Sequence, residues 1–197
     1  MKNIIGVDID NVIAATDEKI RELIELFCGI SSQQENILSW HYSTSTGITK
    51  GQEQYVLEKL HNKYISELKL INGAKECLDI LSGEYFIWLL TSRPISAKNL
   101  TIKWLQEKLI PYDKLFFIKN KSVFADKVTF LVEDKAETAL DFSSQGVKVY
   151  LFDYPWNSKI SNSLIVRVFS WYHLLSVLNI SGNQNHCKKV LNYQDTY

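Results

Sequence analysis

The sequence is poor in cysteine and has no excess of charge of either sign. Its three cysteines, Cys28, Cys77 and Cys187, are widely spaced and form no Cys-x-x-Cys pair. This spacing supports neither a disulfide framework nor a zinc site and favours a reducing cytoplasm. Lysine plus arginine and aspartate plus glutamate each number 22. Since a nucleic-acid polymer usually requires a basic surface, this balance argues against such a partner.

The sequence also lacks a long apolar run. No stretch approaches the roughly 18 continuous apolar residues of a membrane-spanning helix. The N-terminus, Met1-Lys2-Asn3, leads directly into an apolar strand and has no signal-peptide pattern. With 197 residues and 46% hydrophobic content, the chain is long and apolar enough for one globular domain, with or without a modest insertion. We therefore expect a soluble cytoplasmic protein without a membrane partner.

The most informative segment present is the apolar run that begins at Asn3 and ends at Asp8-Ile9-Asp10. A continuous apolar run is typical of a strand buried on both faces of a parallel sheet. Such a strand delivers the residues that follow it to the carboxyl edge of the sheet, where ligands bind. Two carboxylates there repel each other unless a cation such as Mg²⁺ compensates them. The alternative is an ordinary polar turn, because Asp and Asn favour turns.

Short apolar strands alternate with amphipathic helices along most of the chain. This alternation predicts an α/β fold with a doubly wound, mostly parallel, Rossmann-like sheet. Between residues 16 and 72 only helical patterns occur, so we expect a small helical cap inserted after the first strand. Residues 1–15 and 73–180 then form the α/β core, and the polar residues 181–197 form a flexible tail. The expected strands are the N-terminal run, Tyr85–Leu90, Leu115–Ile118, Val128–Val132, Val147–Phe152 and Val166–Val168. The first expected helix begins at Thr16 and the second covers about residues 50–70. The other expected helices are Ala74–Leu81, Ser96–Leu109, about Lys135–Phe142 and about Ser170–Leu178.

Polar groups follow four of these strands in a fixed order. Asp8 and Asp10 come first, then Thr91-Ser92, then a group of lysines, then Glu133-Asp134. Parallel strands bring such groups to one edge of the sheet. A carboxylate nucleophile, an acid, a hydroxyl group, an ammonium group and metal-binding carboxylates together suit phosphoryl transfer. Each signal has a structural alternative when taken alone, such as helix capping by Thr91 and Ser92.

This order resembles the haloacid dehalogenase superfamily of aspartate-nucleophile phosphatases. Within it, the chain is most similar to the 5'(3')-deoxyribonucleotidase family. Asp8-Ile9-Asp10-Asn11-Val12 resembles the first motif, Leu89-Leu90-Thr91-Ser92-Arg93 the second and Leu131-Val132-Glu133-Asp134 the fourth. The closer similarity depends on Thr91-Ser92-Arg93-Pro94, on Phe152–Asn157 and on the segment from Val166 to Trp171.

The resemblance implies a role for each matching residue. Asp8 would attack phosphorus, and Asp10 would protonate the leaving oxygen and then activate water. Thr91, Ser92 and a lysine would bind the phosphoryl oxygens. Lys121 is favoured as that lysine, while Lys119 and Lys127 remain open. Asp8, Asp134 and the backbone carbonyl of Asp10 would bind Mg²⁺, with Glu133 in a supporting role.

One departure from the family pattern concerns the fourth motif. Related nucleotidases often have two aspartates there, followed by arginine, whereas this chain has Glu133, Asp134 and Lys135. Glutamate has a longer side chain than aspartate, so we expect metal binding to survive this change.

Substrate contacts are predicted in the cap and beside the motifs. The aromatic segment Trp40-His41-Tyr42 could stack on a nucleobase or pack within the cap. Ile13 could line the pocket and limit the sugar. Arg93 could steer phosphate or lock its own loop through a salt bridge. We class His61 as a structural or surface residue.

The leading hypothesis is a Mg²⁺-dependent phosphatase that hydrolyses nucleoside monophosphates through an aspartyl-phosphate. The alternatives are a phosphatase of another small phosphomonoester, such as a sugar phosphate, and a non-catalytic nucleotide-binding relative. The preferred base, the 5' or 3' position, the sugar and a homodimer remain open at this stage.

Overall fold

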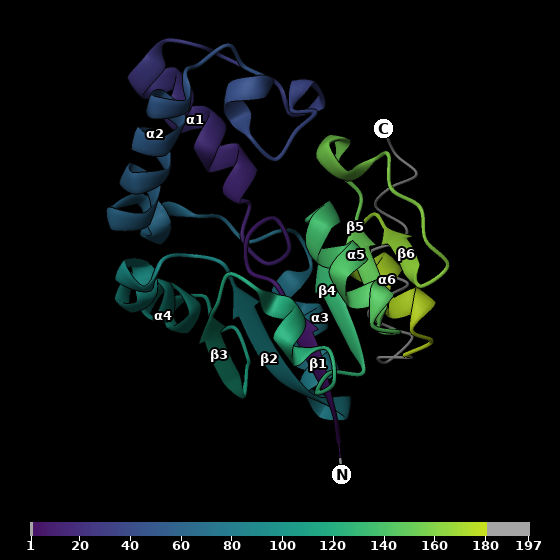
Figure 1. The fold of residues 1–197 in the computed structure, drawn as a ribbon. Helices are drawn as coiled ribbons and strands as arrows, with labels where there is room; N and C mark the ends of the chain where they lie inside the picture. The colour runs from purple at the N-terminus through teal and green to yellow at the C-terminus, as the bar shows by residue number, and fades with distance from the viewer. Residues whose placement is uncertain (1, 181–197) are drawn as a thin grey trace, which may run out of the picture.

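A computed structural model describes residues 2–180 of the chain, and the tail expected over 181–197 lies outside these residues. Six strands form one sheet in the order β3-β2-β1-β4-β5-β6, and every pair of neighbours is parallel (Figure 1). The predicted α/β fold with a doubly wound sheet is confirmed. The strands are β1 (Asn3–Val7), β2 (Tyr85–Thr91), β3 (Lys114–Phe117), β4 (Phe130–Glu133), β5 (Lys148–Phe152) and β6 (Ile165–Val168).

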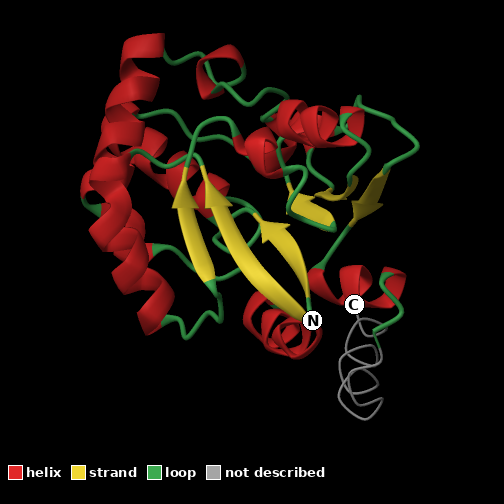
Figure 2. Cartoon of the chain, turned by 60° about the horizontal axis from the view of Figure 1, so that its bottom comes forward, coloured by secondary structure: helices red, strands yellow, loops and turns green. Residues whose placement is uncertain are grey.

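Helices cover both faces of the sheet (Figure 2). Because side chains alternate along a strand, Leu89 packs on one face of β2 and Leu90 on the other. The first face is covered by α3 (Ala74–Glu84), α4 (Lys98–Glu107) and α6 (Trp171–Val177), and the second face by α5 (Ala136–Ser144). The continuous apolar runs of the strands are the sequence signal of this two-sided burial.

The strand order reverses next to β1. From β1 the chain proceeds outward through β2 to β3, and it then returns to β4 on the other side of β1. The Asp8 amide donates to the Val132 carbonyl at 2.9 Å, which extends the β1–β4 pairing by one residue. Ligands of open α/β sheets bind at such a reversal, and the residues that follow β1 and β4 meet there.

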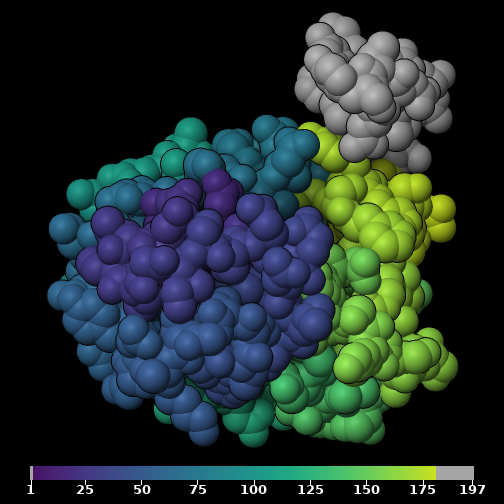
Figure 3. All heavy atoms as spheres, turned by 90° about the horizontal axis from the view of Figure 1, so that it is seen from above, coloured from purple at the N-terminus to yellow at the C-terminus, as the bar shows by residue number. Residues whose placement is uncertain are grey.

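The segment between β1 and α3 lies over the carboxyl edge of the sheet (Figure 1), and seen from above its atoms cover much of that end of the molecule (Figure 3). It contains α1 (Thr16–Cys28) and α2 (Lys50–Asn62), which pack together, and the short 3-10 turns η1 (Gln34–Asn36), η2 (Tyr42–Thr44) and η3 (Tyr64–Glu67). The single helix expected over about 50–70 is wrong, because the backbone leaves the helical conformation at Lys63 and continues as η3.

Two short backbone connections join this segment, residues 16–72, to the sheet layer. The Ala15 amide donates to the Lys69 carbonyl at 3.0 Å, and the Ile71 amide donates to the Ile13 carbonyl at 2.8 Å. The two connections therefore run side by side. The division into cap and core remains a prediction, and we keep the word cap for residues 16–72. No helix among residues 2–180 is long and apolar enough to cross a membrane.

Candidate active site

Lys121 contacts the first aspartate of the site. Its Nζ atom lies 2.7 Å from Asp8 Oδ1 and 2.8 Å from Glu133 Oε2, and all three side chains are buried. Lys121 begins the 3-10 turn η5 (Lys121–Phe124), which is capped by the Asn120 side chain. The other two candidate lysines, Lys119 and Lys127, are exposed, and Lys127 pairs with Asp126. The structure thus brings Lys121 to Asp8 and leaves the other two at the surface.

Glu133, the residue that departs from the family pattern, uses both of its carboxylate oxygens. Oε2 pairs with Lys121, and Oε1 accepts hydrogen bonds from the backbone amides of Asp134 and Lys135 at 3.1 and 3.2 Å. One oxygen of Glu133 thus contacts Lys121, and the other accepts hydrogen bonds from the backbone that follows Glu133. This arrangement suits a supporting residue, which agrees with the role expected for Glu133.

Three buried carboxylates gather around this lysine. Ligand oxygens of Asp8, Glu133 and Asp134 lie within 4.8 Å of one another. Burial and the charge of Glu133 raise the pKa of both Asp8 and Asp134 well above the ordinary value, although Lys121 opposes the shift. For Lys121, burial alone would lower the pKa, but the carboxylates of Asp8 and Glu133 raise it. Three carboxylates and one ammonium leave a formal charge of about −2, which a divalent cation would balance.

Asp134 offers one oxygen to such a cation. Its Oδ2 atom accepts hydrogen bonds from Asn11 Nδ2 at 3.1 Å and from Trp156 Nε1 at 3.2 Å. Its Oδ1 atom is buried and has no hydrogen-bond partner among the residues that the structure describes. A buried carboxylate oxygen without a partner is costly. The donor set and this oxygen therefore fit a hard divalent metal ion.

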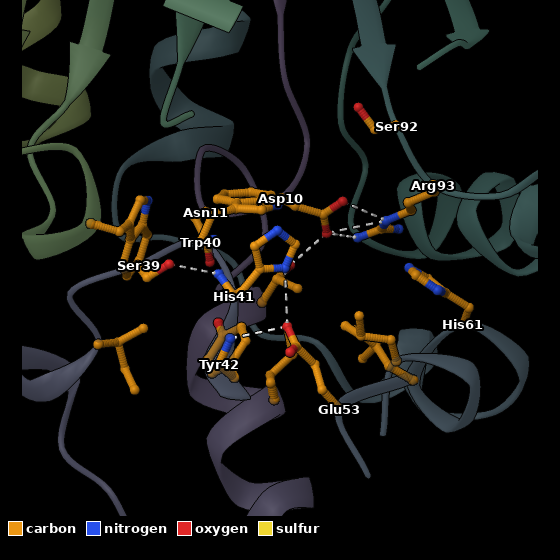
Figure 4. A pocket seen from close by; sticks show the side chains of 16 residues that line it. Asp10, Asn11, Ser39, Trp40, His41, Tyr42, Glu53, His61, Ser92 and Arg93 are labelled. Atoms are coloured by element: carbon orange, nitrogen blue, oxygen red, sulfur yellow. Dashed lines mark hydrogen bonds and ion pairs between the residues drawn. The ribbon is translucent and has the colours of Figure 1, made fainter. Parts of the chain in front are cut away.

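The Asp10 carboxylate is not one of the three clustered carboxylates and is held by Arg93. The guanidinium group contacts the Asp10 carboxylate through Nη2 at 2.7 Å and through Nε at 3.1 Å, and the Thr16 hydroxyl donates to it at 2.6 Å (Figure 4). Arg93 also donates to Thr101 and is buried. Of the two roles considered for Arg93, the salt bridge is the one seen here. Burial alone would raise the pKa of Asp10, but the charge and hydrogen bonds of Arg93 and the Thr16 hydroxyl lower it.

Replacing Arg93 by lysine keeps the charge and removes the planar fork that holds Asp10. Hydrogen bonds to charged groups contribute about 1.5–3 kcal/mol each, so we expect kcat to fall about 10- to 100-fold. Steady-state phosphate release measures this change. Lys98→Arg, a reciprocal exchange at the start of α4 outside the site, is the control and should leave kcat unchanged. An unchanged kcat in Arg93→Lys would show that the hydrogen bonds from Arg93 to Asp10 do not contribute to turnover.

The second motif contributes one buried and one exposed hydroxyl group. Thr91 is the last residue of β2, is fully buried, and accepts a hydrogen bond from the Arg93 amide at 3.2 Å. Ser92 is exposed and lines the cavity described below. Both lie at the carboxyl edge of the sheet, where the sequence predicted them.

A cavity of about 220 Å³ lies beside Asp10 and is lined mostly by residues of the cap. Trp40 and Arg93 line it, and their contact with a substrate stays a prediction. His61, which the sequence suggested was structural or at the surface, also lines it (Figure 4). Ile13 does not line it, because its side chain is fully buried in the core. The complete lining is Asp10, Asn11, Thr16, Ile20, Ile37, Ser39, Trp40, His41, Tyr42, Glu53, Leu57, Leu60, His61, Ser92, Arg93 and Trp156.

Two buried carboxylates of the cap fix the aromatic segment that lines the cavity. Glu53 accepts hydrogen bonds from the backbone amides of Tyr42 and Ser43 at 3.0 and 3.1 Å, and Asp17 accepts one from the Tyr42 hydroxyl at 2.9 Å. Tyr42 is therefore packed within the cap, whereas Trp40 faces the cavity and the Lys135 ammonium lies 5.1 Å from its ring centroid. Packing within the cap, one of the two uses considered, is thus seen for Tyr42, and stacking of the segment on a nucleobase stays a prediction.

Sequence reasoning missed Asn11 as a site residue and left Trp156 unassigned. Asn11 has a left-handed backbone, with φ of 56°, and Trp156 stacks on Tyr154 with ring centroids 4.3 Å apart. The side chains of Asn11 and Trp156 both donate hydrogen bonds to the Asp134 carboxylate. An Asn directly after the Asp-x-Asp pair is a turn signal that is compatible with this backbone, but nothing local in the sequence predicts its contact with Asp134.

Comparison with known proteins identifies the family. Residues 2–182 match the profile described as "5' nucleotidase, deoxy (Pyrimidine), cytosolic type C protein". The chain belongs to this nucleotidase family. It is a phosphomonoester hydrolase, and the predicted resemblance to the deoxyribonucleotidase family is confirmed; its fold is that of haloacid dehalogenase-like hydrolases.

Individual relatives agree with this assignment. A nucleotidase from Clostridium acetobutylicum is 32% identical over 126 residues, which cover 62% of this chain and 66% of that protein. A protein from Chlorobaculum tepidum with the provisional name 5'(3')-deoxyribonucleotidase is 28% identical, with 89% of each chain covered. A haloacid dehalogenase family hydrolase from Deinococcus radiodurans has the same fold, with a TM-score of 0.64, 12% identity, and coverage of 90% of this chain and 95% of that one.

Proposed function

We propose that this nucleotidase hydrolyses nucleoside monophosphates, with deoxyribonucleotides preferred, in a Mg²⁺-dependent reaction that passes through an aspartyl-phosphate on Asp8. The observation that carries the proposal is the buried group of Asp8, Glu133 and Asp134 around Lys121, next to a cavity that Trp40 lines. The preference for deoxyribonucleotides draws on the provisional name of the Chlorobaculum tepidum relative. The sparse cysteines favour a cytoplasmic setting for the reaction.

Asp8, Asp134 and the backbone carbonyl of Asp10 are the groups that we assign to hold Mg²⁺. When bound, the ion would neutralise charge on the phosphoryl oxygens during transfer. The formal charge of about −2 in the cluster and the partnerless Asp134 Oδ1 support a divalent ion there. Glu133 holds Lys121 in place through Oε2.

The first chemical step forms a bond between Asp8 and phosphorus. Lys121 contacts Oδ1 of Asp8, so we assign the attack to Oδ2. The ester bond between phosphorus and the nucleoside oxygen breaks, and a proton from the Asp10 carboxyl group goes to that leaving oxygen. Lys121, Thr91 and Ser92 bind phosphoryl oxygens. Arg93 favours the ionised form of Asp10 at rest, and an arriving phosphate dianion opposes this by raising the pKa of Asp10.

The second step restores the enzyme. Asp10, now ionised, takes a proton from water, and the water oxygen attacks phosphorus. The bond between phosphorus and Asp8 breaks, so inorganic phosphate and the Asp8 carboxylate are released. The contacts of Arg93 and Thr16 with Asp10 suit this step because they favour a carboxylate that can accept a proton.

The cavity supports a nucleoside as the leaving group. It lies beside Asp10, and its wall includes the indole of Trp40, on whose face a base can stack. The second candidate, a sugar phosphatase, would not require such an aromatic wall.

A side-by-side substrate comparison tests the nucleoside assignment. Base stacking contributes about 1–3 kcal/mol, so Trp40→Ala should lower kcat/KM for deoxynucleoside monophosphates about 5- to 150-fold. The same variant should change kcat/KM for deoxyribose 5-phosphate less than about twofold. Tyr55→Ala, which removes an exposed aromatic ring from the cap, is the control and should behave as wild type. Equal rates on both substrates in wild type would favour the sugar phosphatase, and nucleotide binding without turnover would favour a non-catalytic relative.

A further inference from the structure

Asn11 joins two parts of the molecule that the proposed mechanism treats separately. Its side-chain Nδ2 donates to Asp134 Oδ2 at 3.1 Å, and its Oδ1 accepts a hydrogen bond from the Asp17 backbone amide at 2.7 Å. The side chain is buried. One amide group therefore contacts the carboxylate that we assign to the metal and also the first turn of helix α1 in the cap.

The contact with Asp17 fills a gap at the start of α1. The residue at the N-cap position is Ala15, whose side chain cannot accept a hydrogen bond. An N-cap side chain normally accepts from the second or third helical residue. Asp17 is the second residue of α1, so Asn11 caps the helix from outside it.

The backbone of Asn11 is fixed from both sides. Its amide donates to the Ala14 carbonyl at 2.8 Å, and its own carbonyl accepts from the Tyr154 hydroxyl at 3.0 Å. Its φ of 56° lies in the left-handed region, where asparagine is better tolerated than most residues. These contacts hold the amide group in place between Asp134 and α1.

The hydrogen bond from Asn11 to Asp134 determines which oxygen of the Asp134 carboxylate is left for a cation. Asn11 and the Trp156 indole both donate to Oδ2, which leaves Oδ1 buried and without a partner. Groups that orient a metal ligand in this way typically affect metal affinity or activity by 10- to 100-fold. Asn11 differs from Trp156 because it also accepts a hydrogen bond from the first turn of α1.

We propose that Asn11 is a positioning residue that couples cation binding at Asp134 to the first turn of α1. The inference rests on the proposed function, because it takes Asp134 as a ligand of Mg²⁺. A bound cation fixes the Asp134 carboxylate, which fixes the Asn11 amide, which in turn strengthens the hydrogen bond from Asp17. The start of the cap thereby responds to the occupancy of the metal site.

Two variants and a control separate the effect of Asn11 from that of Trp156. Asn11→Gly removes both hydrogen bonds and keeps the backbone, since glycine adopts this φ without strain. Trp156→Phe removes only the other hydrogen bond to Asp134. Asn179→Gly is the matched control, because Asn179 also has a left-handed backbone, with φ of 54°, and follows α6 far along the chain.

Two measurements are made on the full chain: Mg²⁺ affinity by calorimetry, and hydrogen exchange of the Asp17 amide with and without Mg²⁺. In wild type and in Asn179→Gly, we expect Mg²⁺ to slow this exchange about tenfold. In Asn11→Gly, Mg²⁺ should bind about 10- to 100-fold more weakly, and the Asp17 amide should exchange rapidly even when Mg²⁺ saturates the site. Trp156→Phe should bind Mg²⁺ more weakly and still show slower exchange at saturation.

The outcomes distinguish this inference from the proposed function. If wild type binds Mg²⁺ and releases phosphate, but Asn11→Gly retains both the affinity and the Mg²⁺-dependent slowing, the coupling through Asn11 is wrong and the proposed function stands. If wild type binds no Mg²⁺, both are overturned.

Discussion

Asp8→Asn is expected to abolish phosphate release while raising the stability of the metal-free protein. The amide is a poor nucleophile, so kcat should fall by about 10⁴-fold or more. Burial and the charge of Glu133 raise the pKa of Asp8, which means that its ionised form destabilises the folded state. A neutral amide of the same shape removes this cost, so the melting temperature in EDTA should exceed that of wild type.

The pH dependence of stability follows from the same shift. Because the folded pKa of Asp8 is raised, the folded protein holds more protons than the unfolded chain between the unfolded and folded pKa values. Metal-free wild type should therefore lose stability as the pH rises from about 4 through the folded pKa. Asp8→Asn should show a shallower loss, and Asp134 should account for the remainder, since burial and Glu133 also raise its pKa.

Thermal unfolding in EDTA across this pH range, together with phosphate release in Mg²⁺, measures both effects. Asp141→Asn, an exposed change on α5, is the control for a lost carboxylate and should be neutral in both assays. If Asp8→Asn kept wild-type turnover, Asp8 would not be the nucleophile. A variant that melted below wild type at neutral pH would show that Lys121 compensates Asp8 fully.

Lys121→Met should produce the largest loss of stability. The change leaves Asp8 and Glu133 buried without the ammonium that contacts both at 2.7 and 2.8 Å. Removing one partner of a buried ion pair costs about 3–5 kcal/mol. For a chain of this size, each kcal/mol corresponds to about 2–4 °C, so the melting temperature in EDTA should fall by about 6–20 °C. The kcat should fall about 10²- to 10³-fold, as for loss of one group that stabilises transferred charge.

The two lysines that the sequence left open provide matched controls. Lys119→Met and Lys127→Met remove exposed ammonium groups, and their effects on the free energy of unfolding should stay within about 0.5 kcal/mol. Thermal unfolding and phosphate release of the three variants decide the assignment. If Lys119→Met or Lys127→Met lost activity while Lys121→Met did not, the phosphate-binding lysine would be a different one.

The strands and their ends were predictable because their signals are local. The residues from Ile4 to Val7 are apolar because both faces of β1 are covered, and Asp8 follows directly at the carboxyl edge. Lys121 could not be separated from Lys119 and Lys127 by such signals. Which of the three lysines reaches Asp8 after β1 depends on the backbone path into η5, and this path has no local sequence signal.

Other features depended on contacts between residues far apart in the sequence. Asn11 lies 123 residues before Asp134 in the sequence, and Trp156 lies 22 residues after it. Neither hydrogen bond can therefore be predicted from a local sequence pattern. Ile13 is apolar and close to the first motif, but its side chain is in the core. His61 lies in a helix with a helical apolar pattern, and the packing of α2 against α1 and against the short turn that follows β2 brings it to the cavity.

The most direct test of the proposed function is phosphate release from deoxynucleoside monophosphates by the wild-type protein, with Mg²⁺ and with EDTA. The site predicts turnover in Mg²⁺ and its loss in EDTA, because the carboxylates of Asp8, Glu133 and Asp134 outnumber the single ammonium of Lys121. Restoring Mg²⁺ should restore the rate. Equal turnover in EDTA, or no turnover of any nucleoside monophosphate in Mg²⁺, would contradict a metal-dependent nucleotidase.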